Sequence, residues 1–300
     1  MRRLSLSPSF SAARRRVLGT SAALLAGGLL PAAGAAQQRI VSVGGALTEI
    51  VYALQAERDL VGVDSTSLYP AMAQQLPIVG YARTLSAEGV LALAPTQLLA
   101  TEEAGPPAVI RQIAAAGVPV TVLPAKHRFE GLLERVQRVG AITGRVAAAK
   151  VLADKLNADW VRTQAASRVL QNKRAQRPLR VLFILAHSPS QIMVGGEGTA
   201  AEAMIVYAGA RNAVQGFEGY KPLTPEAAIV ADPDVILLTR QGLDANGGIE
   251  GILRLPGVAQ TAAGRARRVV SLEAMYLLGF GPRLPQAVGE LAQLLDKAAT

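Results

Sequence analysis

Residues 85–101 read LSAEGVLALAPTQLLAT and residues 223–239 read LTPEAAIVADPDVILLT, so one pattern occurs twice in the chain. Each copy places a Ser or Thr before a glutamate, followed by a short helical run, a proline and an apolar run typical of a buried strand. The hydroxyl group can cap the helix, because it accepts a hydrogen bond from an amide left unpaired at the helix start. The repetition indicates two lobes of similar design.

Short apolar runs alternate with helical patterns throughout both halves. In the first half RIVSV, LVGV, TQLLA and VPVTVL read as strands, with helices through Leu54 and near 109–116; in the second half RVLFILA, DVILLT and RRVVSL read as strands, with a helix near 199–208. Strands that alternate with helices predict βαβ units and a parallel sheet. We therefore expect an α/β protein with two Rossmann-like lobes.

A long helix is predicted between the lobes. Residues 145–177 contain neither Gly nor Pro, and Leu152, Leu156 and Trp160 recur at helical spacing. A helix of this length would span about 50 Å at ~1.5 Å per residue. The predicted organisation is an N-terminal lobe at 38–144, a linker helix at 145–177 and a C-terminal lobe at 178–300. Trp160 is expected to pack against a lobe.

The N-terminal segment has the layout of an export signal. Residues 1–35 combine a basic region, an apolar stretch at 17–30 and small residues before Ala36. The arginines also resemble a twin-arginine signal, and both export routes stay open. Five arginines lie in this segment and no acidic residue does, so its removal would lower the formal net charge from +9 to +4. This modest charge, with 4% aromatic residues, argues against nucleic-acid binding.

The chain contains no cysteine. Disulfides, thiolate metal sites and a cysteine nucleophile are therefore excluded. The cysteine that carries the lipid of a bacterial lipoprotein is also missing. We expect an exported, soluble periplasmic protein that is not a lipoprotein.

Residues 64–88, DSTSLYPAMAQQLPIVGYARTLSAE, present a tyrosine on a polar turn. Tyr69 follows the strand-like run 60–63 and precedes Pro70, which favours an extended loop conformation for the tyrosine. A phenolate oxygen is a hard anionic ligand suited to ferric iron, and tyrosine is one of the side chains that hold haem iron. The alternative is a turn tyrosine whose ring covers the surface of a lobe.

This stretch, together with SVGGALTEI, VGGEGTAAEAMI, GYKPLTPEA and LLGFGPR, resembles the periplasmic haem-binding proteins of haem ABC importers. The most specific part is DST-S-x-YP followed by GY-x-R-x-LSAEG. The resemblance implies ferric haem held as the transported ligand in a cleft between the lobes. It also implies that Tyr69 is the axial iron ligand.

Other residues are candidates for the same ligand. The resemblance implies that Arg240, after the run DVILLT, hydrogen-bonds the tyrosine. Arg83, in the segment GYAR with Tyr81, can pair with a haem propionate through its forked guanidinium. Surface positions explain both arginines equally well. Lys126 and Arg283 are further cations that can face the cleft.

A second axial ligand is possible at His187, where some haem-binding relatives carry a histidine. The residues that follow read Ser188-Pro189-Ser190 rather than the glycines of those relatives, which puts the path of this loop in doubt. His127 is expected on a loop surface.

Glu88 and Glu226 occupy matching positions in the two copies of the repeat. Each can simply offset the dipole of the helix that it begins. The resemblance implies that they dock onto arginines of the membrane permease.

The partners implied by the resemblance are haem, the inner-membrane permease with its ATPase and, indirectly, an outer-membrane haem receptor. A monomer is expected. A ferric siderophore or cobalamin on the same fold is the second reading, and a periplasmic enzyme the third. No GxSxG elbow is present to support an enzyme.

Overall fold

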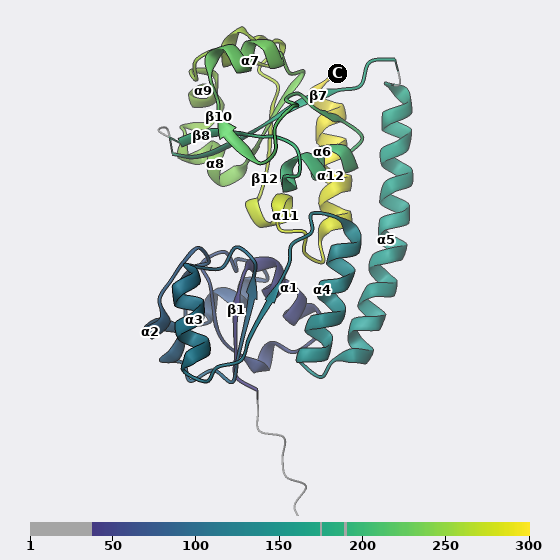
Figure 1. Cartoon of the computed structure of the whole chain (residues 1–300). Coiled ribbons are helices and arrows are strands. Elements are labelled where there is room, and N and C mark those ends of the chain that lie inside the picture. Colours follow the sequence, from purple (N-terminus) through teal and green to yellow (C-terminus); the bar gives the residue numbers. More distant parts are fainter. Residues whose placement is uncertain (1–37, 175, 189–190) are drawn as a thin grey trace, which may run out of the picture. The chain divides into compact units, whose positions relative to one another are not determined.

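The computed structural model describes residues 38–174, 176–188 and 191–300, which include two β-sheets and the helices that cover them (Figure 1). The predicted signal at 1–35 lies outside these residues. Residues 38–300 form one compact unit, and all elements below belong to it. The predicted α/β class is confirmed. The exact boundaries of the lobes within this unit stay a prediction.

The N-terminal lobe is built on a parallel four-stranded sheet in the order β2-β1-β5-β6. Its strands are β1 (Ile40–Val43), β2 (Leu60–Val63), β5 (Gln97–Thr101) and β6 (Val120–Leu123). Its helices are α1 (Gly45–Ala53), α2 (Ala87–Leu91), α3 (Pro107–Ala115) and α4 (Phe129–Ile142), with 3-10 turns η1 (Glu57–Asp59) and η2 (Ala71–Gln75). A small antiparallel pair, β3 (Gly80–Tyr81) and β4 (Thr84–Leu85), lies between β2 and α2 in the chain.

The C-terminal lobe is built on a mixed sheet in the order β10-β8-β7-β11-β12, with β9 paired to β7. Its strands are β7 (Arg180–Ser188), β8 (Gln191–Gly195), β9 (Arg211–Asn212), β10 (Tyr220–Pro222), β11 (Val235–Thr239) and β12 (Val269–Leu272). Strands β8 and β10 are antiparallel to their neighbours, which the sequence did not predict. The connection from β7 to β8 is too short for the crossover that a parallel pair requires.

The helices of the C-terminal lobe follow in chain order. They are α6 (Ala200–Tyr207), α7 (Pro225–Ala231), α8 (Arg240–Ala245), α9 (Gly248–Leu253), α10 (Ala262–Arg265), α11 (Ala274–Leu278) and α12 (Leu284–Ala298), with a 3-10 turn η3 (Val258–Gln260). The repeat noted in the sequence has the expected caps. Ser86 accepts a hydrogen bond from the Gly89 amide at the start of α2, and Thr224 accepts one from the Ala227 amide at the start of α7.

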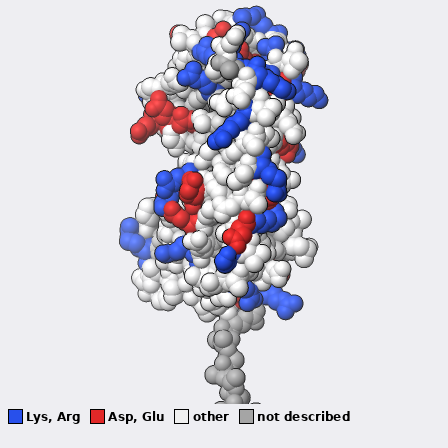
Figure 2. Space-filling view, turned by 90° about the vertical axis from the view of Figure 1, so that its right-hand side faces the viewer, with Lys and Arg blue, Asp and Glu red and all other residues white. Residues whose placement is uncertain are grey.

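Helix α5 (Val146–Lys173) occupies most of the segment predicted as a linker and packs against α4 and α12 (Figure 1). On the face of the molecule that carries α5, basic and acidic side chains lie beside one another (Figure 2). Lys150 pairs with Asp154 at 2.7 Å, and Lys155 pairs with Asp159 at 2.6 Å, both one helical turn apart. Such exposed pairs stabilise a helix by about 0.3–0.5 kcal/mol each.

Buried side chains form three clusters. The largest contains residues of both lobes and of the helices between them, including Leu47, Leu132, Leu156, Phe183 and Leu291. A second lies on the other face of the N-terminal sheet under α2 and α3, and a third on the other face of the C-terminal sheet. The shared cluster means that the two lobes are joined by a common core as well as by α5.

Trp160 packs as predicted. Its ring stacks on Phe129, at the start of α4, with 4.7 Å between centroids and an angle of 4°. Tyr207, at the end of α6, meets it edge-on at the same distance. Among the described residues, no helix is both long enough and apolar enough to cross a membrane.

Candidate functional site

A buried carboxylate organises the loop that carries Tyr69. Asp64 follows β2 and is 1% exposed. Its Oδ1 accepts hydrogen bonds from the Gly44 amide (2.8 Å) and the Ser67 hydroxyl (3.0 Å). Its Oδ2 accepts from the Thr66 amide (3.1 Å) and the Thr66 hydroxyl (2.7 Å). The motif DSTS therefore forms a local hydrogen-bonded turn, called the Asp64 turn below, that fixes the path of the chain just before Tyr69.

The Asp64 turn is also hydrogen-bonded to the start of α1. The Gly45 amide donates to Thr66 Oγ1 at 2.9 Å. Any side chain at Gly45 would clash, since its Cβ would lie 2.4 Å from the Thr66 carbonyl oxygen. The glycine at this position thus permits close approach of two backbone segments and brings the Tyr69 loop to the carboxyl end of the sheet.

Tyr69 lies half exposed on this loop, with 49% of its surface accessible. The guanidinium carbon of Arg283 is 3.9 Å from the centroid of its ring. A cation at this distance is attracted to the face of an aromatic ring. The arrangement leaves the tyrosine accessible and places a positive charge beside it.

Arg283 is itself held by carboxylates from two parts of the chain. Its Nε and a terminal nitrogen donate to the two oxygens of Glu49 at 2.9 and 2.5 Å. Glu273 lies 3.8 Å away. The Glu49 side chain is 4% exposed and that of Arg283 is 21% exposed, so this forked pair is largely shielded from solvent.

Burial and charge act in opposite directions on this pair. Burial raises the pKa of Glu49 above its ordinary value, although the hydrogen bond and the charge of Arg283 oppose that rise. Burial alone would lower the pKa of Arg283, but Glu49, Glu273 and Tyr69 outweigh it and raise that pKa. The guanidinium therefore stays charged beside Tyr69.

A pocket of about 760 Å³ lies next to Tyr69. It is formed by α1, the Tyr69 loop, the middle of α5 and the start of α12, and its lining includes Glu49, Tyr52, Tyr69, Pro70, Leu152, Lys155, Leu156, Asp159, Arg162, Pro282, Arg283 and Pro285. Neither Arg83 nor Arg240 is among its lining residues. Aliphatic and ring surfaces stand beside charged groups, as in many sites for organic ions.

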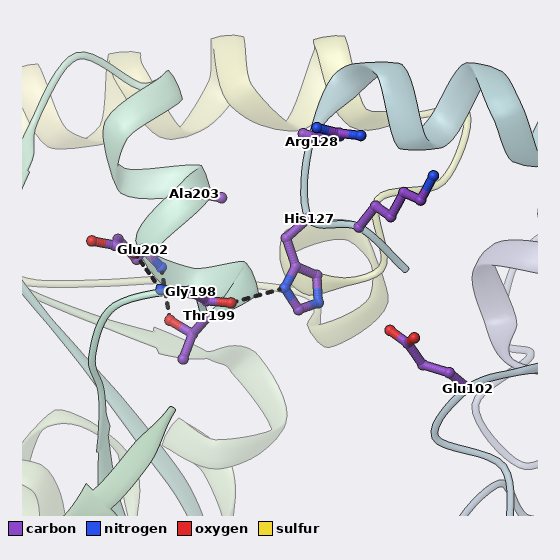
Figure 3. Close-up of a pocket in the computed structure, with 8 residues that line it drawn as sticks. Glu102, His127, Arg128, Gly198, Thr199, Glu202 and Ala203 are labelled. Atoms are coloured by element: carbon purple, nitrogen blue, oxygen red, sulfur yellow. Dashed lines mark hydrogen bonds between the residues drawn. The ribbon is translucent and has the colours of Figure 1, made fainter. Parts of the chain in front are cut away.

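A second pocket, of about 620 Å³, lies between the two lobes, near the starts of α4 and α6 (Figure 3). His127 points across it, and its Nδ1 lies 3.2 Å from the Gly198 carbonyl oxygen. Glu102, Lys126, Arg128 and Glu202 line the same pocket. His127 was expected on a loop surface; it also makes a contact between the lobes.

Two further contacts join the lobes near this pocket. The Phe129 amide donates to the Tyr207 hydroxyl at 3.2 Å. Buried Arg135 donates to the Phe280 carbonyl oxygen at 2.5 Å, and burial lowers its pKa to about 10. The junction is thus held by polar contacts around the shared core.

Arg83 and Tyr81 lie together on the N-terminal lobe. Arg83 pairs with Glu103 at 2.6 Å and is well exposed. Burial lowers the pKa of Arg83, but the Glu103 hydrogen bond and the charges of Glu103, Tyr81 and Tyr220 outweigh it, so the net pKa is raised. Tyr220 belongs to β10 of the opposite lobe. A propionate at Arg83 would share it with Glu103.

Arg240 is the exposed first residue of α8. In the described part of the chain no hydrogen bond joins it to Tyr69; the cation against that ring is Arg283. Gln241, the next residue in the chain, donates a hydrogen bond to Glu273 at 3.2 Å, and Glu273 is one of the two carboxylates near Arg283. Its role as the hydrogen-bond partner of Tyr69 stays a prediction.

The remaining predicted residues lie apart from this cluster. The backbone of His187 belongs to β7, and its side chain lies outside the described residues. Glu88 and Glu226 are both exposed in the first turns of α2 and α7. Their carboxylates are therefore accessible to a partner protein.

Glu49 and Glu273 were missed in the sequence. Glu49 falls inside an apolar helical run, SVGGALTEIVYAL, where a buried carboxylate is unusual. That position is a signal for a buried partner. Glu273 caps α11 through bonds from the Met275 and Tyr276 amides, both 2.8 Å, and gave no comparable signal.

Several solved structures similar to this chain are of haem-binding proteins. The haem-binding protein BhuT, in complex with two haems, is 46% identical, covers 88% of this chain and 99% of its own, and has a TM-score of 0.81. RhuT from Roseiflexus sp. RS-1, without ligand, is 39% identical over 88% of this chain and all of its own, with a TM-score of 0.83. A periplasmic haem-binding protein from Pseudomonas aeruginosa is 37% identical over 88% of this chain and 94% of its own, with a TM-score of 0.81.

Curated relatives are more distant. An uncharacterised ABC transporter substrate-binding lipoprotein of Bacillus subtilis, YvrC, is 26% identical over 85% of this chain and 79% of its own length. A vitamin B12-binding protein of Pectobacterium carotovorum is 35% identical, but over only 33% of this chain and 36% of its own length. The periplasmic binding protein family model matches residues 40–276. Because this match spans well over half of the chain, the protein belongs to the periplasmic binding protein family.

Proposed function

We propose that this protein binds ferric haem in the periplasm and delivers it to an inner-membrane ABC permease. Membership of the family makes it a substrate-binding protein rather than an enzyme and gives a periplasmic location. The observation that carries the haem assignment is the setting of Tyr69. This tyrosine is accessible, follows the buried Asp64 turn and lies beside the guanidinium of Arg283. It belongs to a chain that is 46% identical to a haem-binding protein over 88% of its length.

The chemistry of the residues around Tyr69 fits haem as cargo. The phenol supplies an oxygen ligand suited to ferric iron. Leu68 and Met72 on the same loop expose apolar side chains, 42% and 59% accessible, which can contact a porphyrin. Arg83 and Arg240 are exposed cations available to propionates. Tyr81 stands beside Arg83, and His187 is a candidate second iron ligand.

The transporter partners follow from this assignment. We expect Glu88 and Glu226 to contact arginines of the permease, which works with its ATPase, and an outer-membrane receptor to supply haem upstream. Free diffusion is proposed because the chain has no cysteine for lipid attachment, and a monomer is proposed with it. The B. subtilis relative is a lipoprotein, so cell fractionation is the test. Protein that stays with washed membranes would contradict free diffusion.

Cobalamin is the second candidate ligand. The partial match to vitamin B12-binding proteins favours it over siderophores. That match covers a third of the chain, whereas the haem-binding structures cover nearly nine tenths. Haem is therefore the better supported ligand.

An absorbance titration tests the assignment. Ferric haem added to purified protein should give a saturable spectrum with tyrosinate-to-iron charge-transfer bands. Tyr69→Phe keeps the ring on Arg283 and removes only the hydroxyl, so the bands should disappear and the affinity should fall by about 100-fold or more. Tyr207→Phe, which removes a tyrosine hydroxyl on α6 of the other lobe, should keep the bands. Wild-type protein that binds cobalamin and gives no saturable change with haem would refute the proposal.

A further inference from the structure

We propose that the Glu49–Arg283 ion pair couples iron coordination at Tyr69 to the junction between the two lobes. Arg283 would act as a positioning residue, since it touches the tyrosine ring and need not touch haem. This inference rests on the proposed function. It adds a mechanism by which the lobes can hold the ligand and let it go.

The ion pair joins the lobes at a place remote in sequence. Glu49 lies on α1 of the N-terminal lobe, and Arg283 precedes α12, 234 residues later. Both oxygens of Glu49 accept hydrogen bonds from the guanidinium, which fixes the orientation of its plane. Glu49 is almost completely buried and therefore cannot exchange this partner for water at low cost.

The same guanidinium covers Tyr69. Its central carbon is 3.9 Å from the tyrosine centroid and 4.8 Å from that of Tyr276. Because the guanidinium of Arg283 is hydrogen-bonded to both oxygens of Glu49, its position beside the Tyr69 ring depends on how α12 is placed relative to α1. Moving α12 away from α1 would separate Arg283 from Glu49 and from Tyr69 in one step.

Coordination of iron changes the charge beside Arg283. The bound tyrosine is a phenolate, so its oxygen gains negative charge near a guanidinium already facing Glu49 and Glu273. This attraction favours the arrangement in which the lobes are joined. Linkage is reciprocal: if the bound ligand strengthens the junction, opening the junction must weaken ligand binding by the same factor. A permease that separates the lobes would thereby weaken the iron–tyrosine bond.

A double-mutant cycle tests the coupling. Glu49→Gln keeps the shape of the side chain and removes its charge; we expect it to weaken haem affinity about tenfold when Tyr69 is present, within the usual range of coupling between sites. In a Tyr69→Phe background the same substitution should change affinity less than about twofold, because the phenolate that Arg283 stabilises is gone. An equal loss in both backgrounds would overturn the coupling while leaving the haem assignment intact.

Arg283 variants and a matched control sharpen the result. Arg283→Gln should weaken affinity and shift the charge-transfer bands, and Arg283→Lys should recover part of both because it keeps the charge but not the fork. Arg174→Gln removes another partly buried ion pair, to Asp296 at 3.0 Å, away from Tyr69, and should leave bands and affinity unchanged. Bands unaffected by Arg283→Gln would also overturn the proposal. Wild-type protein that gives no bands at all would instead refute the proposed function.

The lobe junction is measured separately by spin labels. The chain has no cysteine, so Gln112→Cys on α3 and Ala266→Cys after α10, both exposed, provide unique labelling sites in the two lobes. Pulsed electron paramagnetic resonance should show a narrower distribution of distances between the two spin labels when haem is bound. Glu49→Gln should broaden the distribution of the ligand-free protein. Identical distributions in wild type and Glu49→Gln would contradict a bridge between the lobes.

Discussion

Removal of the Arg283 side-chain charge should destabilise the protein by leaving Glu49 buried without its cation. In Arg283→Met, Glu49, which is 4% exposed in the wild-type protein, loses two hydrogen bonds. Uncompensated buried charges of this kind typically cost 3–5 kcal/mol. Glu49 can limit that cost by taking up a proton, which requires about 1.4 kcal/mol for each pH unit above the unfolded pKa of about 4.3, or about 4 kcal/mol at pH 7. We therefore expect a loss of about 3–4 kcal/mol at pH 7.

The pH dependence follows from the raised pKa of Glu49. A carboxyl group whose pKa is higher in the folded state binds its proton more readily there, so the folded state loses stability as the pH rises above the unfolded value. The deficit of Arg283→Met should accordingly shrink to about 1 kcal/mol at pH 5. At pH 7 the melting temperature should fall by about 6–12 °C for a unit of this size.

Calorimetry and urea unfolding at pH 5 and pH 7 measure both effects. The double variant Glu49→Gln/Arg283→Met is the control, because it removes both charges and should recover most of the lost stability. A double variant as unstable as the single one would show that the penalty comes from lost packing. A deficit of equal size at both pH values would likewise refute the role given to the Glu49 charge.

Three further outcomes are expected. Asp64→Ala removes the acceptor of four hydrogen bonds and should lower both the melting temperature and the haem affinity. Asp64→Asn should lower both by less. Unchanged affinity of Asp64→Ala in the haem titration would mean that the Asp64 turn does not position Tyr69. Thr224→Ala should cost about 1 kcal/mol in urea unfolding and leave haem binding intact, and a loss of binding would be the contrary result. Trp160→Ala should cost about 3–5 kcal/mol in the same assay, against less for Trp160→Phe; equal losses would exclude a packing role for the larger ring system.

Local patterns carried much of the fold. The caps at Ser86 and Thr224 were predictable because a hydroxyl followed by a glutamate before an apolar run has a direct physical meaning. The antiparallel strands β8 and β10 were not, since pairing direction depends on how the chain returns and not on the composition of the strand. Helix α5 was predictable because residues 145–177 contain neither Gly nor Pro and carry apolar residues at helical spacing.

The site was less accessible to sequence reasoning. The chemistry of Tyr69 suggested a ligand, and Pro70 placed the residue on a loop. Its contact with Arg283 depends on tertiary structure that joins residues more than 200 positions apart, which no local pattern encodes. The family resemblance implied Arg240 as the cation near the tyrosine, whereas Arg283 reaches Tyr69 only through the packing of α12 against α11 and α5.

The stack of Phe129, Trp160 and Tyr207 makes the molecule its own optical reporter. Trp160 is the single tryptophan of the chain, and its ring touches side chains from the start of α4 and the end of α6, one on each lobe. All tryptophan fluorescence therefore originates at the place where the lobes meet. Changes in its emission maximum would follow movement of the junction. A bound porphyrin, which absorbs where tryptophan emits, would quench the same signal, so lobe movement and ligand occupancy can both be followed in the unlabelled protein.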